Sequence, residues 1–135
     1  MSVDLVVFMS RAAMPAPQTW ANAIVEAGFP AELDSDFDVD TFSGFLPCAY
    51  DGAEAGFEYF AAPAEPNHPK LPPEVDFSVT FTTHADMREL AAATVAAAVL
   101  CGLTDGILYD PQADLVVPAS DASTWAREQL DEIEL

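Results

Sequence analysis

The sequence predicts an α+β fold, in which residues 1–135 form a single globular domain with a mainly antiparallel sheet and about three helices packed on it. Patterns typical of strands and helices follow each other in the order strand, helix, strand pair, strand, helix, strand pair, helix. Short turn sequences separate the members of each strand pair, which favours antiparallel hairpins. A chain of 135 residues that is 51% hydrophobic suits one buried core and does not require a second domain.

The first strand is predicted from Val3 to Phe8, where β-branched and aromatic residues are interrupted only by Asp4. The first helix is predicted to begin at Pro17, because proline suits the first helical position. Its apolar residues at helical spacing are Trp20, Ala23, Ile24 and Ala27. Gly28 followed by Pro30 marks the end of this helix.

The segment from Ala31 to Thr41 carries an acid at every second position. These acids are Asp34, Asp36, Asp38 and Asp40. An extended conformation would place all four carboxylates on one face. Asp is a poor strand former, however, so a loop or a frayed edge strand is an equally good interpretation of this segment.

A hairpin is predicted next, because residues 42–50 and 55–61 flank the turn-like sequence 51–54. Its aromatic residues, with Phe37, are interpreted as core residues. They are Phe42, Phe45, Phe57, Tyr59 and Phe60. The segment from Pro63 to Pro73 contains five prolines, so we expect a semi-extended connection that cannot join a central strand.

The clearest strand pattern lies at residues 75–82, where apolar residues alternate with polar ones and predict one buried face. Thr83 and Asp86 resemble a capping box at the start of a helix. Helical spacing then continues from Met87 to Cys101, and Gly102 is expected to end the helix. Because this helix is apolar nearly all round, we expect it to be central.

The last elements are a second small hairpin and a final helix. Residues 107–109 and 115–117 surround a turn-like sequence, and Ser120 is expected to cap the helix. The apolar stripe of this helix is Ala122, Trp125, Ala126, Gln129 or Leu130, and Ile133. Its last turns carry Asp131, Glu132 and Glu134, which oppose the helix dipole and indicate a surface charge kept for another reason.

Charge is the strongest functional signal in the sequence. The chain has 23 Asp and Glu residues against four Lys and Arg, for a formal net charge of -19. Ten of the acids lie between Arg11 and Lys70 without an intervening base: Glu26, Glu32, Asp34, Asp36, Asp38, Asp40, Asp51, Glu54, Glu58 and Glu65. Such a field repels nucleic acid and anionic membranes, so we expect a basic protein surface as the partner.

The candidate partner-binding residues come from the middle of this acidic stretch. They are Asp34, Asp36, Asp38, Asp40, Asp51, Glu54 and Tyr50. Carboxylates form charge-assisted hydrogen bonds with Arg and accelerate encounter with a cationic surface. Tyr50, and also Tyr59, would serve as interface anchors inside the anionic rim if they are exposed.

Metal sites are not indicated by the spacing of possible ligands. The alternating acids resemble the start of an EF-hand loop, but Val39 and Phe45 stand where that loop requires Gly and Glu. Zinc ligands would have to come from Cys48, His68, His84 and Cys101, which lack the short spacings of a zinc site. We therefore expect no metal or other cofactor, and two reduced, buried thiols.

Catalysis is not indicated either, since no nucleophile elbow, metalloprotease motif, phosphate loop or dinucleotide fingerprint is present. His84 with Asp86 is the only local pair of imidazole and acid. Their place at a predicted helix start favours a simpler role, in which Asp86 interacts with the helix N-terminus and His84 is solvated. We expect a protein that is not an enzyme.

The size of the chain, its α+β pattern and the carboxylate-rich segment from Glu32 to Asp40 together resemble the small acidic immunity proteins of bacterial polymorphic or contact-dependent toxin systems. The resemblance implies tight, non-catalytic binding to a cationic toxin domain, often a nuclease. It implies a role and transfers no functional residue, because immunity proteins have many unrelated folds.

Three alternatives remain open. The protein could mimic nucleic acid and regulate a DNA-binding protein, which would use the same electrostatics. It could be a small enzyme or ligand-binding domain with His84 at its site. Finally, general adaptation to a salty cytoplasm would also produce an acidic composition.

A soluble cytoplasmic protein is expected from the terminal and apolar segments. The sequence MSVDLVVFMSR contains an acid and lacks the positive charges that begin a signal peptide. The longest uncharged apolar stretch, Leu90 to Thr104, is Ala-rich and shorter than the ~20 residues of a membrane-spanning helix.

Overall fold

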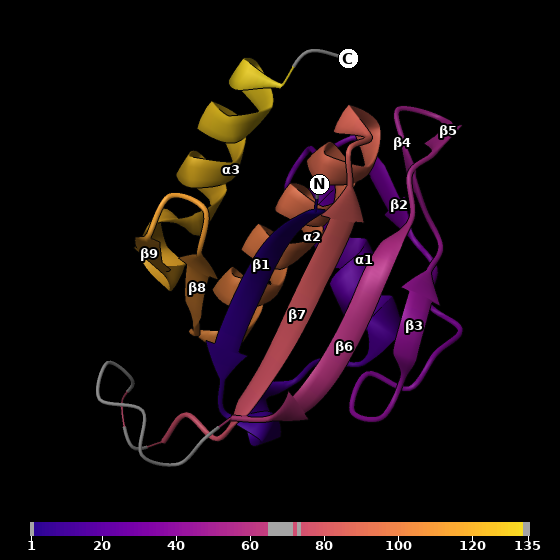
Figure 1. The fold of residues 1–135 in the computed structure, drawn as a ribbon. Coiled ribbons are helices and arrows are strands. Elements are labelled where there is room, and N and C mark those ends of the chain that lie inside the picture. Colours follow the sequence, from indigo (N-terminus) through magenta and orange to yellow (C-terminus); the bar gives the residue numbers. More distant parts are fainter. Residues whose placement is uncertain (1, 65–71, 73, 134–135) are drawn as a thin grey trace.

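The computed structural model describes residues 2–64, 72 and 74–133 and has the predicted α+β architecture (Figure 1). The strands of its six-stranded sheet, in spatial order, are β3 (Ser43–Leu46), β6 (Phe57–Pro63), β7 (Phe77–His84), β1 (Ser2–Met9), β8 (Ile107–Asp110) and β9 (Leu115–Pro118). A second sheet contains β2 (Ala31–Leu33), β4 (Cys48–Tyr50) and β5 (Ala53–Glu54). All of these neighbouring strands pair antiparallel.

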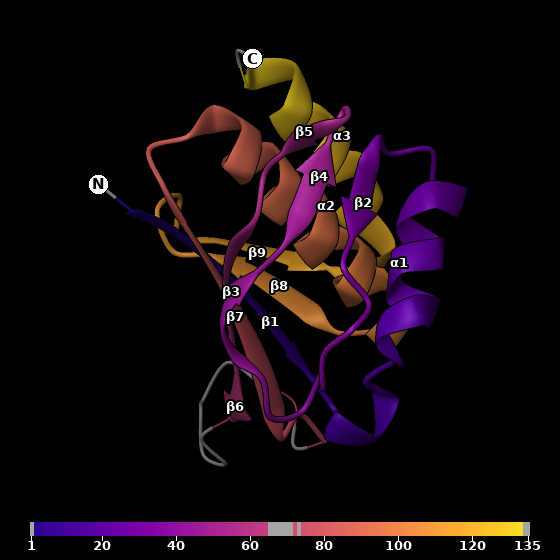
Figure 2. The same ribbon diagram turned by 90° about the vertical axis from the view of Figure 1, so that its right-hand side faces the viewer.

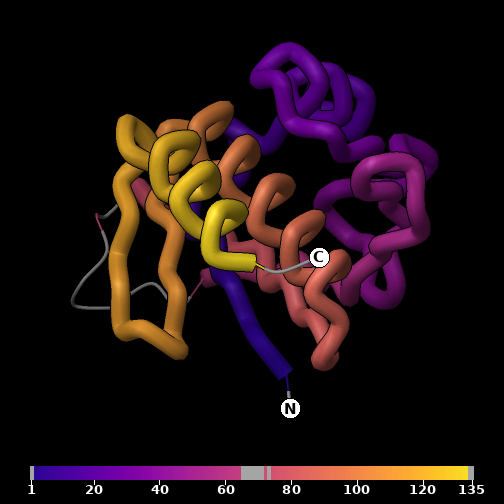
Figure 3. The backbone as a smooth tube through the Cα atoms, turned by 90° about the horizontal axis from the view of Figure 1, so that it is seen from above, coloured from indigo at the N-terminus to yellow at the C-terminus, as the bar shows by residue number. Residues whose placement is uncertain are grey.

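Three α-helices lie on one face of the large sheet, and no helix of the described residues covers the other face, which we call the open face (Figures 1 and 2). They are α1 (Pro17–Glu26), α2 (Met87–Thr104) and α3 (Ala122–Glu132), with short 3-10 helices η1 (Arg11–Ala13) and η2 (Ala119–Asp121). Seen from above, α2 lies between α3 on one side and α1 with the small sheet on the other (Figure 3). The core therefore sits between the large sheet and α2.

The first strand and first helix confirm the sequence prediction. In β1, Leu5, Val7 and Met9 are buried, as the alternating pattern of a strand with one core face requires. Helix α1 begins at Pro17 and buries Trp20 on the face toward the core.

The predicted hairpin between residues 42–50 and 55–61 is confirmed only in part. β3 does pair with β6, in the register Gly44 to Tyr59. Pro47, which has no amide hydrogen for a strand ladder, separates β3 from β4. β4 instead joins the small sheet, and its turn to β5 has φ of 52° at Asp51 and 81° at Gly52. Positive φ at both central residues is the type I′ conformation that Asp-Gly favours.

The central strand and helix are confirmed with shifted ends. β7 starts at Phe77 and buries every second residue, including Thr83, which therefore does not form the predicted capping box. Asp86 caps α2 instead, because its carboxylate accepts the backbone N–H groups of Arg88 and Glu89. The helix passes through Gly102, contrary to the prediction, and ends at Thr104, followed by Asp105 as the C-cap with φ of 51°.

Helix α2 is buried on all sides over residues 91–101, so the predicted central position is confirmed. The indole N–H of Trp20 on α1 donates to the carbonyl of Ala96 on α2 over 3.1 Å. By length and composition α2 could cross a membrane, but 67% of it is buried within this molecule. This is consistent with a soluble protein in which α2 is the core helix.

The final hairpin and helix are also present. β8 and β9 pair antiparallel, and α3 buries Ala122, Trp125 and Ala126 as predicted. Ser120 is not the helix cap, because residues 119–121 form η2 and α3 begins after it. The proline-rich segment lies largely outside the described residues, which exclude 65–71 and 73, and Glu134 also lies outside them.

The aromatic and thiol predictions are partly correct. Phe57 and Tyr59 are buried, but Phe45 and Phe60 point outward on the open face and are more than half exposed. Both cysteines are free and buried, as predicted. Burial raises the pKa of Cys48 from 9.0 to about 11 and that of Cys101 to about 12.

Candidate partner-binding surface

The alternating acids form a loop, which we call the acidic loop and define as Asp34–Phe42. The extended interpretation is wrong, because β2 ends at Leu33. The carboxylate of Asp34 accepts the backbone N–H of Asp36, and that of Asp38 accepts the backbone N–H of Asp40. Such local bonds compete with a strand ladder and favour turns.

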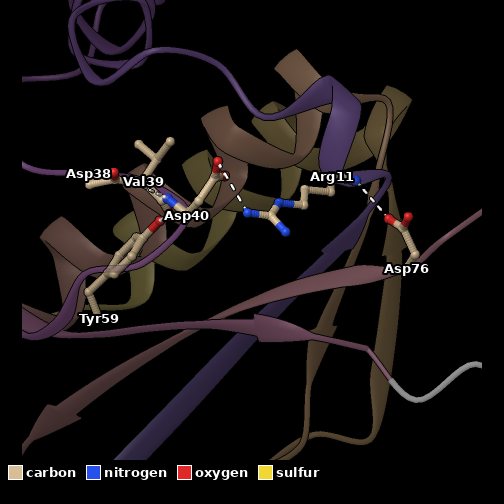
Figure 4. Close-up of polar contacts among 6 residues, drawn as sticks. All are labelled: Arg11, Asp38, Val39, Asp40, Tyr59 and Asp76. Atoms are coloured by element: carbon tan, nitrogen blue, oxygen red, sulfur yellow. Dashed lines mark hydrogen bonds and ion pairs between the residues drawn. The ribbon is translucent and has the colours of Figure 1, made fainter.

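The apolar residues of the acidic loop face the core. The ring of Phe37 lies 6.3 Å from that of Trp20 and 5.3 Å from that of Tyr59, measured between centroids. The hydroxyl of Tyr59 donates to the carbonyl of Val39 over 2.7 Å (Figure 4). Tyr59 is 1% exposed, and its pKa is raised first by burial and then by the charges of Asp40 and Asp38. The loop is therefore tied to the core in the free protein.

The acids of the acidic loop lie at the surface to different degrees, and Asp34 and Asp40 are half-buried. Asp36 and Asp38 are exposed, and the side chain of Asp36 has no hydrogen-bond or ion-pair partner among the described residues. Asp40 lies 3.7 Å from the guanidinium of Arg11, whose backbone N–H is held by Asp76 (Figure 4). This exposed ion pair neutralises one charge of the loop, whose other carboxylates form no ion pair among the described residues.

Asp51 and Glu54 do not join the acidic loop. The small sheet separates them, because the backbone N–H of Asp51 donates to Pro30 at one end of β2, whereas that of Asp34 donates to Pro47 at the other end. In Figure 2 the turn between β4 and β5 lies at the top of the molecule and the loop before β3 lies at the bottom. The predicted acids thus form two separate groups.

Tyr50 is buried, whereas an interface anchor would have to be exposed. Its side chain is 6% exposed, and Tyr59 is buried as well. The pKa of Tyr50 is raised, first by burial and second by the charge of Asp51. We therefore remove Tyr50 from the candidate surface and keep the acids.

His84 lies on the open face of the sheet beside Glu58. Its Nε2 is 2.8 Å from a carboxylate oxygen of Glu58, and the side chains are 61% and 54% exposed. Asp86 is engaged by the N-terminus of α2, as predicted, and so does not orient the imidazole. His84 also lines none of the grooves of about 280, 390 and 310 Å³ formed by described residues.

Metal ligands are likewise not gathered within the described part of the chain. Among residues 2–64, 72 and 74–133, no three His, Cys, Asp or Glu side chains are close enough together to hold a metal ion. His68, one of the zinc ligands considered from the sequence, lies outside these residues.

Sequence reasoning missed Tyr59 and Arg11 as the residues that hold the acidic loop. Tyr59 reaches the loop over 20 positions and Arg11 over a similar separation, and neither is linked to it by a local pattern. The base-free stretch that begins after Arg11 is the one signal that draws attention to this arginine.

Comparison with known proteins adds no relative. No known family matches the chain, and neither the curated proteins nor the solved structures contain one that is similar to it.

Proposed function

We propose that the protein is a non-catalytic acidic binding protein of the bacterial cytoplasm, which neutralises a cationic toxin domain by covering its surface. A nuclease domain fits best, because an enzyme that binds an anionic substrate presents a basic groove. The residues proposed to make contact are Asp34, Asp36, Asp38 and Asp40, with Asp51 and Glu54 forming a second group on the far side of the small sheet.

The observation that carries this proposal is the two-sided construction of the acidic loop. The ring of Phe37 packs against Trp20 and Tyr59, and the carbonyl of Val39 accepts a hydrogen bond from Tyr59. On the other side of the loop, Asp36 and Asp38 are exposed to solvent. A surface that is ordered before binding loses less conformational entropy on association. In a chain with net charge -19, such a surface favours fast association with a basic partner.

The proposal is tested by capturing partners on the immobilised protein from a lysate of the source organism, with washes at low and then at high salt. We expect one basic domain in a one-to-one complex, released by salt because the attraction is screened. Addition of this protein should then abolish the activity of the captured domain.

A matched pair of variants assigns the binding to the acidic loop. Replacing Asp36, Asp38 and Asp40 together by Asn should remove most of the captured partner. The control carries the same change in charge on other faces, with Gln at Glu26 and Asn at Asp105 and Asp131, and should retain it. Equal capture by both triple variants would remove the acidic loop as the interface.

Other captured partners would favour the alternatives. A resident DNA-binding protein would support the nucleic-acid mimic, which shares the electrostatics and differs in the partner. Failure to capture any specific partner would shift attention to a ligand-binding or enzymatic role that uses His84.

A further inference from the structure

The sheet edge formed by β9, a strand of four residues that ends in Pro118, exposes two large apolar side chains. β9 is the last strand of the large sheet, and β8 is its neighbour on one side only (Figures 1 and 3). Leu115 is 40% exposed and Val116 is 53% exposed. Proteins commonly protect such edges with charged residues, because free backbone groups and apolar side chains invite another strand.

A groove of about 310 Å³ runs between β9 and α3. The four residues of β9 form one wall, and Asp121, Thr124, Trp125 and Glu128 form the other. Spacings of one, three and four residues place Thr124, Trp125 and Glu128 side by side on α3, and Asp121 is the last residue of η2, directly before this helix. From residue 121 to 128 a helix rises about 10 Å, which is the length of roughly three residues of extended chain.

Trp125, which lines this groove and also the groove of about 280 Å³, carries a hydrogen-bond donor without an acceptor among the described residues. Trp125 is 7% exposed, and the donor is its buried indole N–H. By contrast, the buried indole of Trp20 donates to the carbonyl of Ala96. Because a buried, unmatched donor is unfavourable, a carbonyl of an occupant that reaches this N–H would gain a hydrogen bond.

The charge of the groove selects the occupant. Its charged residues are Asp121 and Glu128, and no Lys or Arg lines it. Arg127, between them in sequence, is engaged elsewhere, since it donates to the carbonyl of Ala27 and lies over the ring of Phe29. Apolar residues on one wall and carboxylates on the other match a segment with apolar and cationic side chains.

We propose that this groove binds an extended segment of a partner protein in which apolar residues alternate with Lys or Arg, and that the segment adds a strand to the edge of β9. A second copy of this chain is a poorer occupant, because it would bring its own negative charge to Asp121 and Glu128. The groove and the acidic loop are different surfaces, so this inference does not depend on the function proposed above.

The probe for this site is a capped eight-residue peptide of alternating Val and Lys. It is titrated into the protein, and binding is monitored by the amide NMR spectrum of the protein. The control peptide alternates Ser and Lys and has the same charge. We expect saturable binding of the Val peptide, about tenfold or more tighter than that of the Ser peptide, since its apolar side chains would pack against the exposed side chains of β9. The amides of Leu115, Val116 and Val117 and the indole N–H of Trp125 should shift.

Two double variants test the carboxylates. Replacing Asp121 by Asn and Glu128 by Gln should weaken binding of the Val peptide about tenfold, because both charges of the groove are removed. Replacing Asp131 by Asn and Glu132 by Gln changes the charge of the same helix equally and should alter the affinity less than about twofold.

Several results would overturn the inference. Equal losses in both double variants, or equal affinity for the two peptides, would mean general attraction to an acidic protein. Shifts on the open face of the sheet without shifts in β9 would place the peptide elsewhere. Concentration-dependent dimerisation of the free protein that shifts the β9 amides would identify a second copy as the occupant.

Discussion

The two edges of the large sheet differ in how their aromatic and apolar side chains are packed and hydrogen-bonded. Beside the β3 edge, Trp20 and Tyr59 have hydrogen-bond partners, and the apolar residues of the acidic loop are packed inward. Beside the β9 edge, Trp125 has an unmatched donor, and Leu115 and Val116 are exposed. The comparison shows that a run of acids in the sequence does not by itself define a groove, whereas two acids seven residues apart, Asp121 and Glu128, line one.

The largest expected difference between the edges concerns the two tryptophans. Trp20→Phe removes the bond to Ala96 and leaves a cavity, so it should lower the free energy of unfolding by about 2–4 kcal/mol. Trp125→Phe also removes volume but eliminates an unmatched donor, so we expect a loss of about 1 kcal/mol or less. Urea unfolding monitored by circular dichroism measures both. Equal losses would contradict the assignment of the unmatched donor.

The next effect tests how the acidic loop is held. Tyr59→Phe leaves the carbonyl of Val39 without its donor and should cost about 1–2 kcal/mol of unfolding free energy. Hydrogen exchange at the amides of Asp40 and Phe42 should accelerate, because the loop loses its anchor. Tyr109→Phe is the control, since that hydroxyl contacts Asp114 at the surface and should contribute less than about 0.5 kcal/mol. Unchanged exchange in Tyr59→Phe would show that ring packing alone holds the loop.

The two thiols report on the two regions by their response to pH. Cys48 lies in β4, and the Sγ of Cys101 donates to the carbonyl of Val117 in β9. Burial raises the pKa of Cys48 from 9.0 to about 11 and that of Cys101 to about 12. Above pH 9 the unfolded chain therefore loses these protons before the folded protein does.

Stability should consequently be complete below pH 9 and decline as the pH rises through 11 for Cys48 and 12 for Cys101. Cys48→Ala should flatten the decline between pH 9 and 11. Alkylation should be slow for both thiols at neutral pH and faster for Cys48 at high pH, because Cys48 is 8% exposed and Cys101 fully buried. Rapid alkylation of Cys101 at neutral pH would contradict the packing around β9.

The smallest effect concerns the ion pair of the acidic loop. Arg11→Gln removes the contact with Asp40, but both side chains are substantially exposed, so the unfolding free energy should fall by no more than about 0.5 kcal/mol. Thermal unfolding at low and high salt measures this change, which should vanish at high salt through screening. A loss that persists at high salt would point to the cation–π contact with Phe77 instead.

Local patterns predicted the elements whose structure depends on local periodicity. Three such patterns predict elements that the structure confirms: the alternation in β7, the proline at the start of α1 and the uniformly apolar sequence of α2. The sequence does not predict which strands pair with each other, because strand pairing depends on contacts between residues that are distant in the sequence. Pro47 redirects β4 into a second sheet, and this both buries Tyr50 and separates Asp51 from the acidic loop.

The candidate site was accordingly predicted in composition but not in geometry. The acids of the loop were identified, but the Asx turns that make it a loop depend on which backbone N–H each carboxylate accepts. The groove beside β9 was missed altogether. Its acids, Asp121 at the N-terminus of α3 and Glu128 two turns along it, are seven residues apart, and this spacing is the signal that could have revealed them.

The association rate of the captured basic partner tests the central claim most directly, namely that the acidic loop is the partner-facing surface. Stopped-flow measurements would compare the protein with the triple Asn variant at Asp36, Asp38 and Asp40 and with the control triple variant. For the unaltered protein we predict an association rate that falls steeply with salt. The loop variant should associate about tenfold more slowly and with a weaker salt dependence, and the control variant should change by less than about twofold. Equal rates for the two triple variants would contradict the claim.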